Sequence, residues 1–205
     1  MSKISETLNV KQLLPAAAVV FCIWLMLPGA ESGQHRPPAC TPLIDTAYET
    51  ALLQELKSAR KSIYAIIYLA DADPRYPNGP VLSILKAISS ANSRGIKTTV
   101  VLDHNIEFWK EDVGKEPVIK SKTAYKWLKD NNVRVFLDNK DRTTHTKLFI
   151  IDGRTVFIGS HNLTYAALRK NHELSVMIQS REFANDLIRR LRRQIRDYPE
   201  NALPK

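Results

Sequence analysis

The sequence predicts an α/β fold in which a mixed β-sheet carries helices on both faces. From Asp45 onward, segments with apolar residues at helical spacing alternate with short runs rich in β-branched and aromatic residues. Gly95 separates one helical segment from the strand-like run IKTTVVL, and the order helix, glycine, strand is typical of parallel or mixed sheets. The dipeptide Asp152-Gly153 between two apolar runs predicts a hairpin, and therefore adds antiparallel pairing.

Each element of this fold has its own signal. Apolar residues at helical spacing predict helices over residues 45–59, 81–91, 123–129 and 183–196. Runs of β-forming residues predict strands over residues 62–69, 96–102, 133–136, 144–151, 156–159 and 174–178. Residues 104–120, which include Phe108 and Trp109, have mixed polarity without a clean period, so they are expected to form an exposed loop.

The composition narrows the classes of function. The chain has 205 residues, 44% of them hydrophobic and 25% charged, and these values exclude a disordered chain. Two cysteines are too few for a disulfide scaffold or for a cysteine-rich zinc module. Thirty Lys and Arg against 21 Asp and Glu give a net charge of +9. The expected partner is therefore an anion, whether nucleic acid, anionic lipid or a phosphorylated small molecule.

Residues 1–30 have the pattern of a secretory signal peptide. Two lysines precede an uncharged apolar run over residues 13–27, and the small residues Gly29 and Ala30 follow it. The run is short for a membrane span, which favours cleavage over the alternative of an uncleaved membrane anchor. A secreted or periplasmic protein is expected.

A proline-rich segment separates this signal from the rest of the chain. Residues 31–43 contain three prolines and are expected to form an extended tether ahead of a single domain over residues 44–205. Cys40 lies inside the tether, where we expect a free thiol or an intermolecular disulfide.

Two basic side chains share one face of the strand predicted over residues 144–151. Because side chains alternate along a strand, His145 and Lys147 point the same way. Leu148 and Ile150 make the opposite face apolar, so the strand is expected to be central and buried on both sides. Burying an imidazole and an ammonium group costs desolvation free energy unless they have partners or a ligand, which makes this pair a candidate site.

The hairpin turn decides which residues face the pair. A two-residue loop of Asp152 and Gly153 places His145 opposite Ser160, whereas a loop shifted by one residue places it opposite Asn162. Either register brings a hydroxyl or a carboxamide beside the imidazole. Such a combination can hold a phosphate and attack it.

The order of these residues resembles the signature of the phospholipase D superfamily. His145-x-Lys147-x4-Asp152 is followed by Gly159-Ser160-x-Asn162 and then by Asn171-x-Glu173. The order of expected helices and strands over residues 43–196 is also similar to that family. The resemblance, which is to the small secreted bacterial endonuclease and phospholipase D-like branch, implies an α-β-α sandwich.

The resemblance also implies a role for each matched residue. His145 would attack the phosphorus of a phosphodiester and form a phosphohistidine. Lys147, Ser160 and Asn162 would hold the non-bridging oxygens and stabilise the developing charge. Glu173 would orient a catalytic imidazole and support its charged form.

Other polar residues are expected to play structural roles. Asp152 belongs to the motif, but at about 3.3 Å per residue it lies too far along the strand from Lys147 to touch the same phosphate. Asp103 and His104 follow a predicted strand, where a structural role is favoured over a place in the cleft. His161 and His172 are expected to be neutral surface or loop residues.

The mechanism implied by the resemblance needs a second histidine, which protonates the leaving oxygen and later activates water. The chain has one copy of the motif, because none of its other histidines is followed two residues later by lysine. Single-copy members of the superfamily form homodimers, so the resemblance implies a homodimer with one composite active site built around two copies of His145. No metal or other cofactor is expected, since clustered carboxylates and zinc spacing are both lacking.

The expected function is that of a metal-independent phosphodiesterase. The first candidate is an endonuclease acting on DNA or RNA, which the size, the signal and the basic charge favour. The alternative is a phospholipase D that hydrolyses phosphatidyl head groups, for example phosphatidylcholine to phosphatidate, because a basic face also suits anionic membranes. A nucleic-acid-binding or membrane-binding protein without catalysis is disfavoured, since every motif position is present. The arginines of the last predicted helix fit a solvated face or a contact with a polyanion.

Overall fold

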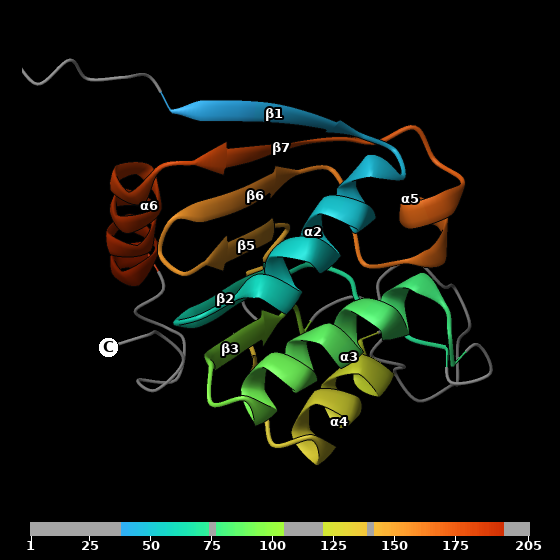
Figure 1. The fold of residues 1–205 in the computed structure, drawn as a ribbon. Coiled ribbons are helices and arrows are strands. Elements are labelled where there is room, and N and C mark those ends of the chain that lie inside the picture. The colour runs from blue at the N-terminus through green and yellow to red at the C-terminus, as the bar shows by residue number, and fades with distance from the viewer. Residues whose placement is uncertain (1–37, 74–76, 105–120, 139–141, 195–205) are drawn as a thin grey trace, which may run out of the picture. The chain divides into compact units, whose positions relative to one another are not determined.

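The computed structural model describes residues 38–73, 77–104, 121–138 and 142–194 (Figure 1). The chain divides into two compact units, Met1–Pro37 and Pro38–Lys205, and all described residues belong to the second unit. The predicted signal segment, the first part of the tether and the predicted loop from residue 105 onward lie outside the described residues. In the described part of the chain, no helix is long and apolar enough to cross a membrane.

Within the described residues, the strands form one seven-stranded mixed sheet with the order β1-β7-β6-β5-β2-β3-β4 (Figure 1). β2, β3 and β4 are parallel to one another, and all other neighbours are antiparallel. The strands are β1 (Ala39–Ile44), β2 (Ser62–Ile67), β3 (Lys97–Leu102), β4 (Arg134–Leu137), β5 (Lys147–Ile151), β6 (Thr155–Gly159) and β7 (Leu174–Gln179). The helices are α2 (Ala47–Ser58), α3 (Pro80–Ser93), α4 (Lys122–Asp130), α5 (Tyr165–Arg169) and α6 (Arg181–Gln194).

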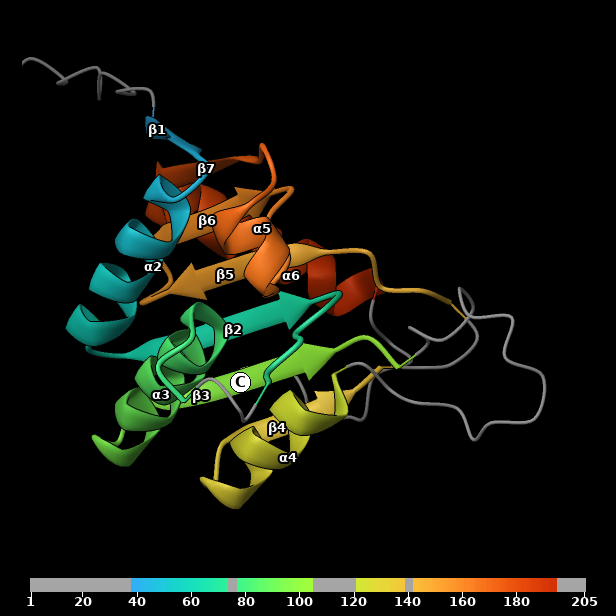
Figure 2. The ribbon, with the colours of Figure 1, turned by 90° about the vertical axis from the view of Figure 1, so that its right-hand side faces the viewer.

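Helices cover both faces of the sheet, which confirms the predicted fold class (Figures 1 and 2). On one face, α2 and α3 pack Leu52 and Leu85 into the same cluster as Phe149 of β5. On the other face, Leu187 of α6 packs against a cluster that contains Ile150 of β5. All five residues of β5 are buried, so the prediction of a central strand covered on both sides is also confirmed.

Two elements have no counterpart among the predicted ones. β1 pairs antiparallel with β7, so the prediction of a tether is wrong for residues 39–43. Pro42 is compatible with this strand because β1 is at the edge of the sheet, where a missing N–H group breaks no ladder. Cys40 on this strand is an exposed free thiol. The short helix α5 begins after Thr164, whose side chain accepts a hydrogen bond from the N–H of Ala167.

The turn between β5 and β6 is longer than either predicted register assumes. Ile151 pairs with Thr155, which leaves the loop Asp152-Gly153-Arg154 between them. Asp152 and Gly153 both have positive φ, 55° and 57°, as the turn chemistry predicts. The N–H of Arg154, however, closes the turn on the carbonyl of Ile151 at 3.0 Å, which adds one residue to the loop. Both predicted registers are therefore wrong.

Asp152 ties the turn to the start of β2. Its carboxylate accepts hydrogen bonds from the backbone N–H groups of Arg60, Lys61 and Ser62, at 2.7 to 3.1 Å. Burial opposes ionisation, but these three hydrogen bonds outweigh it and hold the pKa of Asp152 below its usual value. Contacts of this kind support the structural role that the sequence predicts for the motif aspartate.

We expect Asp152→Asn to lower the free energy of unfolding by about 1 to 3 kcal/mol at pH 7, because charge-assisted hydrogen bonds to three amides are weakened. Asparagine keeps the tolerance for positive φ but replaces one accepting oxygen by an NH₂ group, so the change removes the charge and one acceptor. The stabilisation by Asp152 is present above the unfolded pKa and disappears as pH falls through the lower, folded pKa. Urea denaturation at pH 7 and near pH 3 measures the free energy of unfolding of wild type and variant. Asp130→Asn, at an exposed site on α4, serves as a control. Equal losses in both variants at pH 7 would contradict the assignment.

Candidate active site

All predicted catalytic residues gather at one edge of the sheet, which we call the catalytic edge, whereas the motif residue Asp152 lies at the opposite edge. β1, β2, β3, β4 and β6 end at this edge, whereas β5 and β7 begin there. Polar side chains sit on or just beyond these strand ends, and they are Asp45, Tyr68, Asp103, Asp138, His145, Lys147, Ser160 and Glu173. The topology thus brings together residues from seven separate stretches of sequence.

His145 and Lys147 lie together, as the sequence predicts. The Nζ atom of Lys147 is 3.3 Å from each ring nitrogen of His145 and 3.1 Å from its carbonyl oxygen. Lys147 is buried, with a relative exposure of 9%, whereas His145 is exposed. The imidazole of His145 is therefore accessible, whereas the ammonium group of Lys147 beside it is largely shielded from water.

Tyr68, which follows β2, completes this cluster. Its ring centroid is 4.2 Å from that of His145, and the Nζ atom of Lys147 is 4.5 Å from the same ring centroid. A cation over an aromatic face is attracted by the ring quadrupole. The tyrosine ring therefore contacts both predicted catalytic groups. Nothing in the sequence singled out Tyr68 beyond its place at the end of a buried strand.

Burial and the neighbouring negative charges shift the pKa of Lys147 in opposite directions. Desolvation lowers the pKa of its ammonium group, and the negative charges of Glu173 and Asp103 partly offset this effect. Poorly solvated donors interact strongly with charge that develops on a bound phosphate, because little water competes with them. The arrangement suits Lys147 to the role of oxygen-binding donor.

The segment that carries His145 is held by backbone hydrogen bonds rather than by the ladder of β5. The predicted strand from residue 144 begins only at Lys147. The N–H of Thr144 donates to the carboxylate of Asp103 at 2.6 Å, and the N–H of Tyr68 donates to the carbonyl of Thr146 at 2.8 Å. Asp103 is fully buried, which fits the structural role favoured for it.

Asp138 supports the same corner from the end of β4. It accepts the N–H of His104 at 2.6 Å and lies beside Asp103. Burial raises the pKa of Asp138, hydrogen bonds with Thr144 and His104 oppose the change, and the charge of Asp103 adds to it. Asp103 and Asp138 thus hold two segments in place, the one that precedes His145 and the one that follows β3.

Ser160 and Glu173 form a second pair at the catalytic edge. The hydroxyl of Ser160 donates to the Glu173 carboxylate and accepts the N–H of Leu174 at 3.1 Å. The side chain of Asn171 donates to the other carboxylate oxygen at 3.1 Å. Glu173 is thus engaged by Ser160 and Asn171, and its role toward an imidazole stays a prediction.

The observed β5–β6 register changes which residue of β6 lies opposite Lys147. Extended by one residue, the β5–β6 pairing aligns Lys147 with Gly159 and not with Ser160. Gly159 allows β7 to approach closely, because a β-carbon there would overlap the backbone of Leu174 and Ser175. Asn162 is half-buried, and its Oδ1 atom is buried without a hydrogen-bond partner among the described residues.

His161 lies in the loop after β6, one of the two positions expected for it, but its side chain is buried. Its ring stacks on Tyr48 with centroids 4.3 Å apart, and burial lowers its pKa. The Nε2 atom is 3.0 Å from the carbonyl of Asp45, which can only accept, so this nitrogen carries the proton. Nδ1 then accepts from the hydroxyl of Ser175 at 2.8 Å. Asp45 in turn pairs with the backbone of Glu173 through two hydrogen bonds of 3.0 and 2.8 Å, so this network fixes the position of Glu173.

A cleft of about 790 Å³ opens between α5 and the loop that follows β2. The cleft adjoins the motif. Asp71, which lines the cleft, donates its backbone N–H to the carbonyl of Leu163, and Leu163 follows the motif residue Asn162 in the sequence. The lining of the cleft includes Tyr165, Arg169 and Lys170 together with the carboxylates Asp71 and Asp73. In the described part of the chain, no group of three or more His, Cys, Asp or Glu residues is placed to hold a metal ion.

Comparison with known families agrees with this geometry. The family described as cardiolipin synthase, PLD-like domain, matches residues 52–195, which is well over half of the chain. The chain belongs to the phospholipase D superfamily. The matched range contains every residue of the motif.

Individual relatives of the superfamily differ in length from this chain. Phospholipase D of Rickettsia typhi is 28% identical over 155 residues, which are 74% of this chain and 61% of that protein. Cardiolipin synthase A of Pectobacterium atrosepticum is 28% identical over 122 residues, 58% of this chain and 24% of that protein. The alignments thus span less than two thirds of these relatives.

Two solved structures show the same fold. Nuc of Salmonella typhimurium, a phospholipase D family member, has a TM-score of 0.62 at 24% identity, with 79% of this chain and 97% of that chain covered. NucT from Helicobacter pylori has a TM-score of 0.56 at 20% identity, with 78% and 98% covered. The predicted α-β-α sandwich of the phospholipase D superfamily is confirmed.

Its contacts with both His145 and Lys147 give Tyr68 a testable role. We expect Tyr68→Leu to lower kcat/KM for the soluble diester bis(p-nitrophenyl) phosphate by about 10- to 100-fold, because the ring no longer positions His145 and Lys147. Tyr68→Phe keeps the ring and should retain most activity. The alkaline limb of the pH profile should shift to lower pH in Tyr68→Leu, because the ammonium group of Lys147 loses its contact with the aromatic ring. Equal losses in both variants would assign the effect to the hydroxyl instead.

Proposed function

We propose that this protein is a metal-independent endonuclease that cuts nucleic-acid strands through a phosphohistidine formed on His145. The imidazole attacks phosphorus, the bond to the leaving oxygen breaks, and a second histidine protonates that oxygen. Water, deprotonated by the same second histidine, then releases the phosphate and regenerates His145. Because residues 1–30 have the pattern of a signal peptide, we propose that the enzyme acts outside the cytoplasm, as a secreted or periplasmic protein.

The described residues can supply most of this chemistry. His145 is exposed and can reach a phosphodiester, and Lys147 lies within 3.3 Å of its ring nitrogens, where it can hold a non-bridging oxygen. The side-chain amide of Asn162 lies at the same edge of the sheet and fits the role of a further donor. The hydroxyl of Ser160 would fit this role once its hydrogen bond to Glu173 is exchanged for one to the phosphate. Donors fixed in advance stabilise the charge of the transition state without reorganisation.

The cleft beside the motif is the observation that favours a nucleic acid over a lipid. Tyr165 is 56% exposed, and the Nζ atom of Lys170 lies 5.6 Å from its ring centroid. Exposed aromatic rings next to cations are typical of sites where bases stack and phosphates bind along a single strand. A strand lying in this cleft would reach Asn162 and then His145.

The second histidine would come from a second copy of the chain. Ile44, Ile158 and Leu174 have exposed fractions of 61%, 39% and 57%. The strand pairings place all three on one face of the sheet, next to Ser160 and Glu173. Contiguous exposed apolar residues at a site are typical of an interaction surface. We propose that two copies meet there across a two-fold axis and form one composite site.

A panel of substrates tests the proposed activity. Residues 31–205, which hold every core residue, are incubated with EDTA and plasmid DNA, single-stranded RNA or phosphatidylcholine vesicles, with His145→Ala as control. Cleavage of nucleic acid that is weakened by Tyr165→Ala supports the proposal. Turnover of lipid alone would replace it with the phospholipase D alternative, and no turnover at all would favour a binding protein.

Mixing wild-type and His145→Ala chains tests the composite site. If each dimer has one site that needs both copies of His145, an equal mixture after co-refolding retains about 25% of the wild-type activity. Independent sites would retain about half. Sedimentation of the active species should give twice the mass of one chain. A fully active monomer would contradict the dimer.

A further inference from the structure

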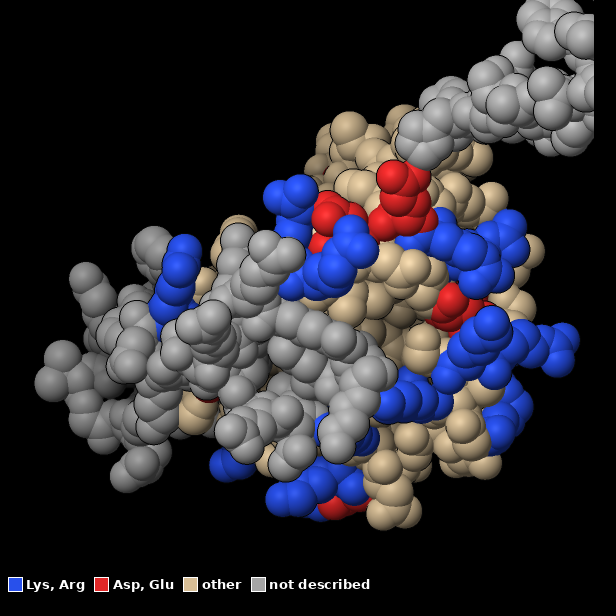
Figure 3. Space-filling model, turned by 90° about the vertical axis from the view of Figure 1, so that its left-hand side faces the viewer, with Lys and Arg blue, Asp and Glu red and all other residues tan. Residues whose placement is uncertain are grey.

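The edge of the sheet opposite the catalytic edge is lined by basic residues. Each of the five connections between described elements there has at least one exposed or half-buried Lys or Arg in it or directly beside it, and Arg189 and Arg190 of α6 add two more. We call these residues the basic edge, and they are Lys57, Arg60, Lys61, Arg94, Lys97, Lys129, Arg134, Arg154, Arg181, Arg189 and Arg190. Figure 3, which shows the molecule from this side, has Lys and Arg side chains spread across the described surface.

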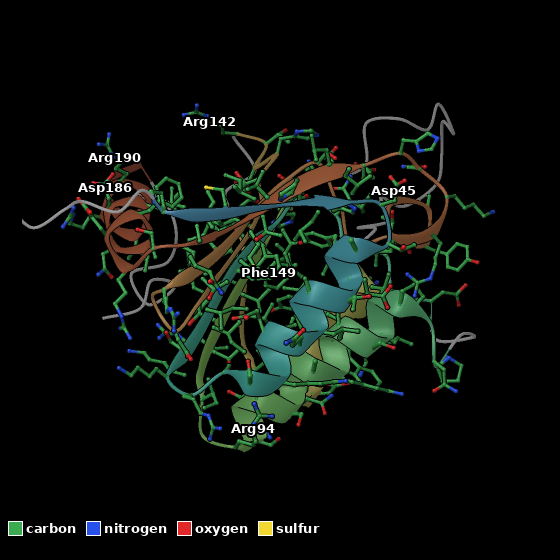
Figure 4. The ribbon with its side chains drawn as sticks, turned by 45° about the horizontal axis from the view of Figure 1, so that its top comes forward. Asp45, Arg94, Arg142, Phe149, Asp186 and Arg190 are labelled. Carbon is green, nitrogen blue, oxygen red and sulfur yellow. The ribbon has the colours of Figure 1, made fainter. Side chains whose placement is uncertain are left out.

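Several acidic residues near this edge are already engaged. Asp152 is bound by backbone amides, Asp130 pairs with Lys126 at 2.5 Å, and Asp186 pairs with Arg189 and Arg190. Figure 4 shows Asp186 and Arg190 at one end of the sheet and Asp45 at the other. The carboxylates of the catalytic edge are engaged as well, because Asp103 and Asp138 are buried and Asp45 and Glu173 accept hydrogen bonds. The basic edge is distinguished by its number of Lys and Arg side chains, which exceeds that of the acidic residues named near it.

The chain enters the sheet from the basic edge. β1 ends at Ile44 on the catalytic edge, so its first residue, Ala39, lies on the basic edge. Pro38, the first described residue, precedes β1 and therefore lies on the side of the basic edge.

We propose that the basic edge docks on anionic lipid head groups, so that the catalytic edge faces away from the membrane. Long flexible lysine and arginine side chains spread over a broad surface suit a fluid layer of phosphates, to which each adds a small attraction. A nucleic acid bound here would instead lie a full strand length away from His145. Strands of four to six residues, at about 3.3 Å per residue, separate the two edges. The docking would leave the active site open to soluble polymers, and it goes beyond the proposed endonuclease activity.

Vesicle flotation tests the docking. Residues 31–205 lack the apolar run, so their binding reports on the domain surface alone. They are floated with vesicles of pure phosphatidylcholine or of phosphatidylcholine with phosphatidylglycerol. Wild-type protein should float only with the anionic vesicles and be released at high salt. Replacing Arg60, Lys61, Lys97 and Arg154 by glutamine should lower this partitioning by about 100-fold or more.

A matched variant controls for net charge. Lys86, Lys122, Arg142 and Lys170 are replaced by glutamine, which removes the same number of charges elsewhere on the domain. This variant should bind anionic vesicles nearly as well as wild type, and equal losses in both variants would overturn the proposal. Loss of DNA binding with unchanged vesicle binding in the first variant would also overturn it, because the basic edge would then be a nucleic-acid surface. Hydrolysis of bis(p-nitrophenyl) phosphate should be unchanged in the first variant, so failure of docking is distinguishable from failure of the enzyme assignment.

Discussion

Replacement of His145 by alanine should lower kcat/KM for a phosphodiester by at least about 10⁴-fold, because the group that forms the covalent intermediate is gone. The remaining donors can still bind the phosphate but cannot divide the reaction into two easier steps. Turnover of bis(p-nitrophenyl) phosphate by wild type and variant measures the loss. Acid quenching of the wild-type reaction should trap a phosphorylated histidine that the variant lacks.

His172→Ala is the matched control for this experiment. His172 is fully exposed next to Glu173, and its Nδ1 lies 3.3 Å from Asp45 at the same edge of the sheet. Its removal should change activity by less than about twofold, as for most surface substitutions. Activity of His145→Ala within tenfold of wild type, with an intact denaturation profile, would mean that another group is the nucleophile.

The fold could be predicted wherever local pattern and burial agree. β2, β3 and β5 are apolar on both faces and are predicted within a few residues of their ends. β1 is missed because Pro42 inside it and the two prolines before it resemble a linker, and it becomes a strand only through pairing with β7. The β5–β6 register is missed because positive φ at Asp152 and Gly153 fits a two-residue loop, whereas the hydrogen bond of Arg154 adds a third residue.

The residues of the candidate site also fall into two groups, those that a local sequence pattern predicts and those that depend on contacts with distant residues. His145 and Lys147 are two residues apart, so strand alternation alone predicts that they share a face. Tyr68, Asp103 and His161 act through contacts with residues far away in sequence, which no local pattern reports. Tyr68 and Asp103 do share one local signal, a polar group directly after a buried strand. That signal is common at strand ends, so it gains meaning only when the topology places both at one edge.

Lys147→Met should lower kcat by about 10²- to 10³-fold while leaving the protein at least as stable as wild type. The rate falls because a donor to the phosphate oxygens is removed from a site with little water. Stability is kept because a buried ammonium group is replaced by an apolar side chain of similar length, which removes a desolvation cost. Kinetics with bis(p-nitrophenyl) phosphate and urea denaturation together measure the two effects. Parallel losses of activity and stability would assign Lys147 a structural role instead.

The pH dependence separates charge from shape at Lys147. Because burial lowers the pKa of its ammonium group, the wild-type rate should decline with rising pH before an ordinary lysine deprotonates. Lys147→Arg keeps a positive charge up to much higher pH, so this decline should disappear from its profile even though the planar guanidinium fits the site less well. An alkaline limb that is identical in wild type and Lys147→Arg would mean that a different group titrates there. Loss of the limb would show that the protonated amine of Lys147 is the form that binds the transition state.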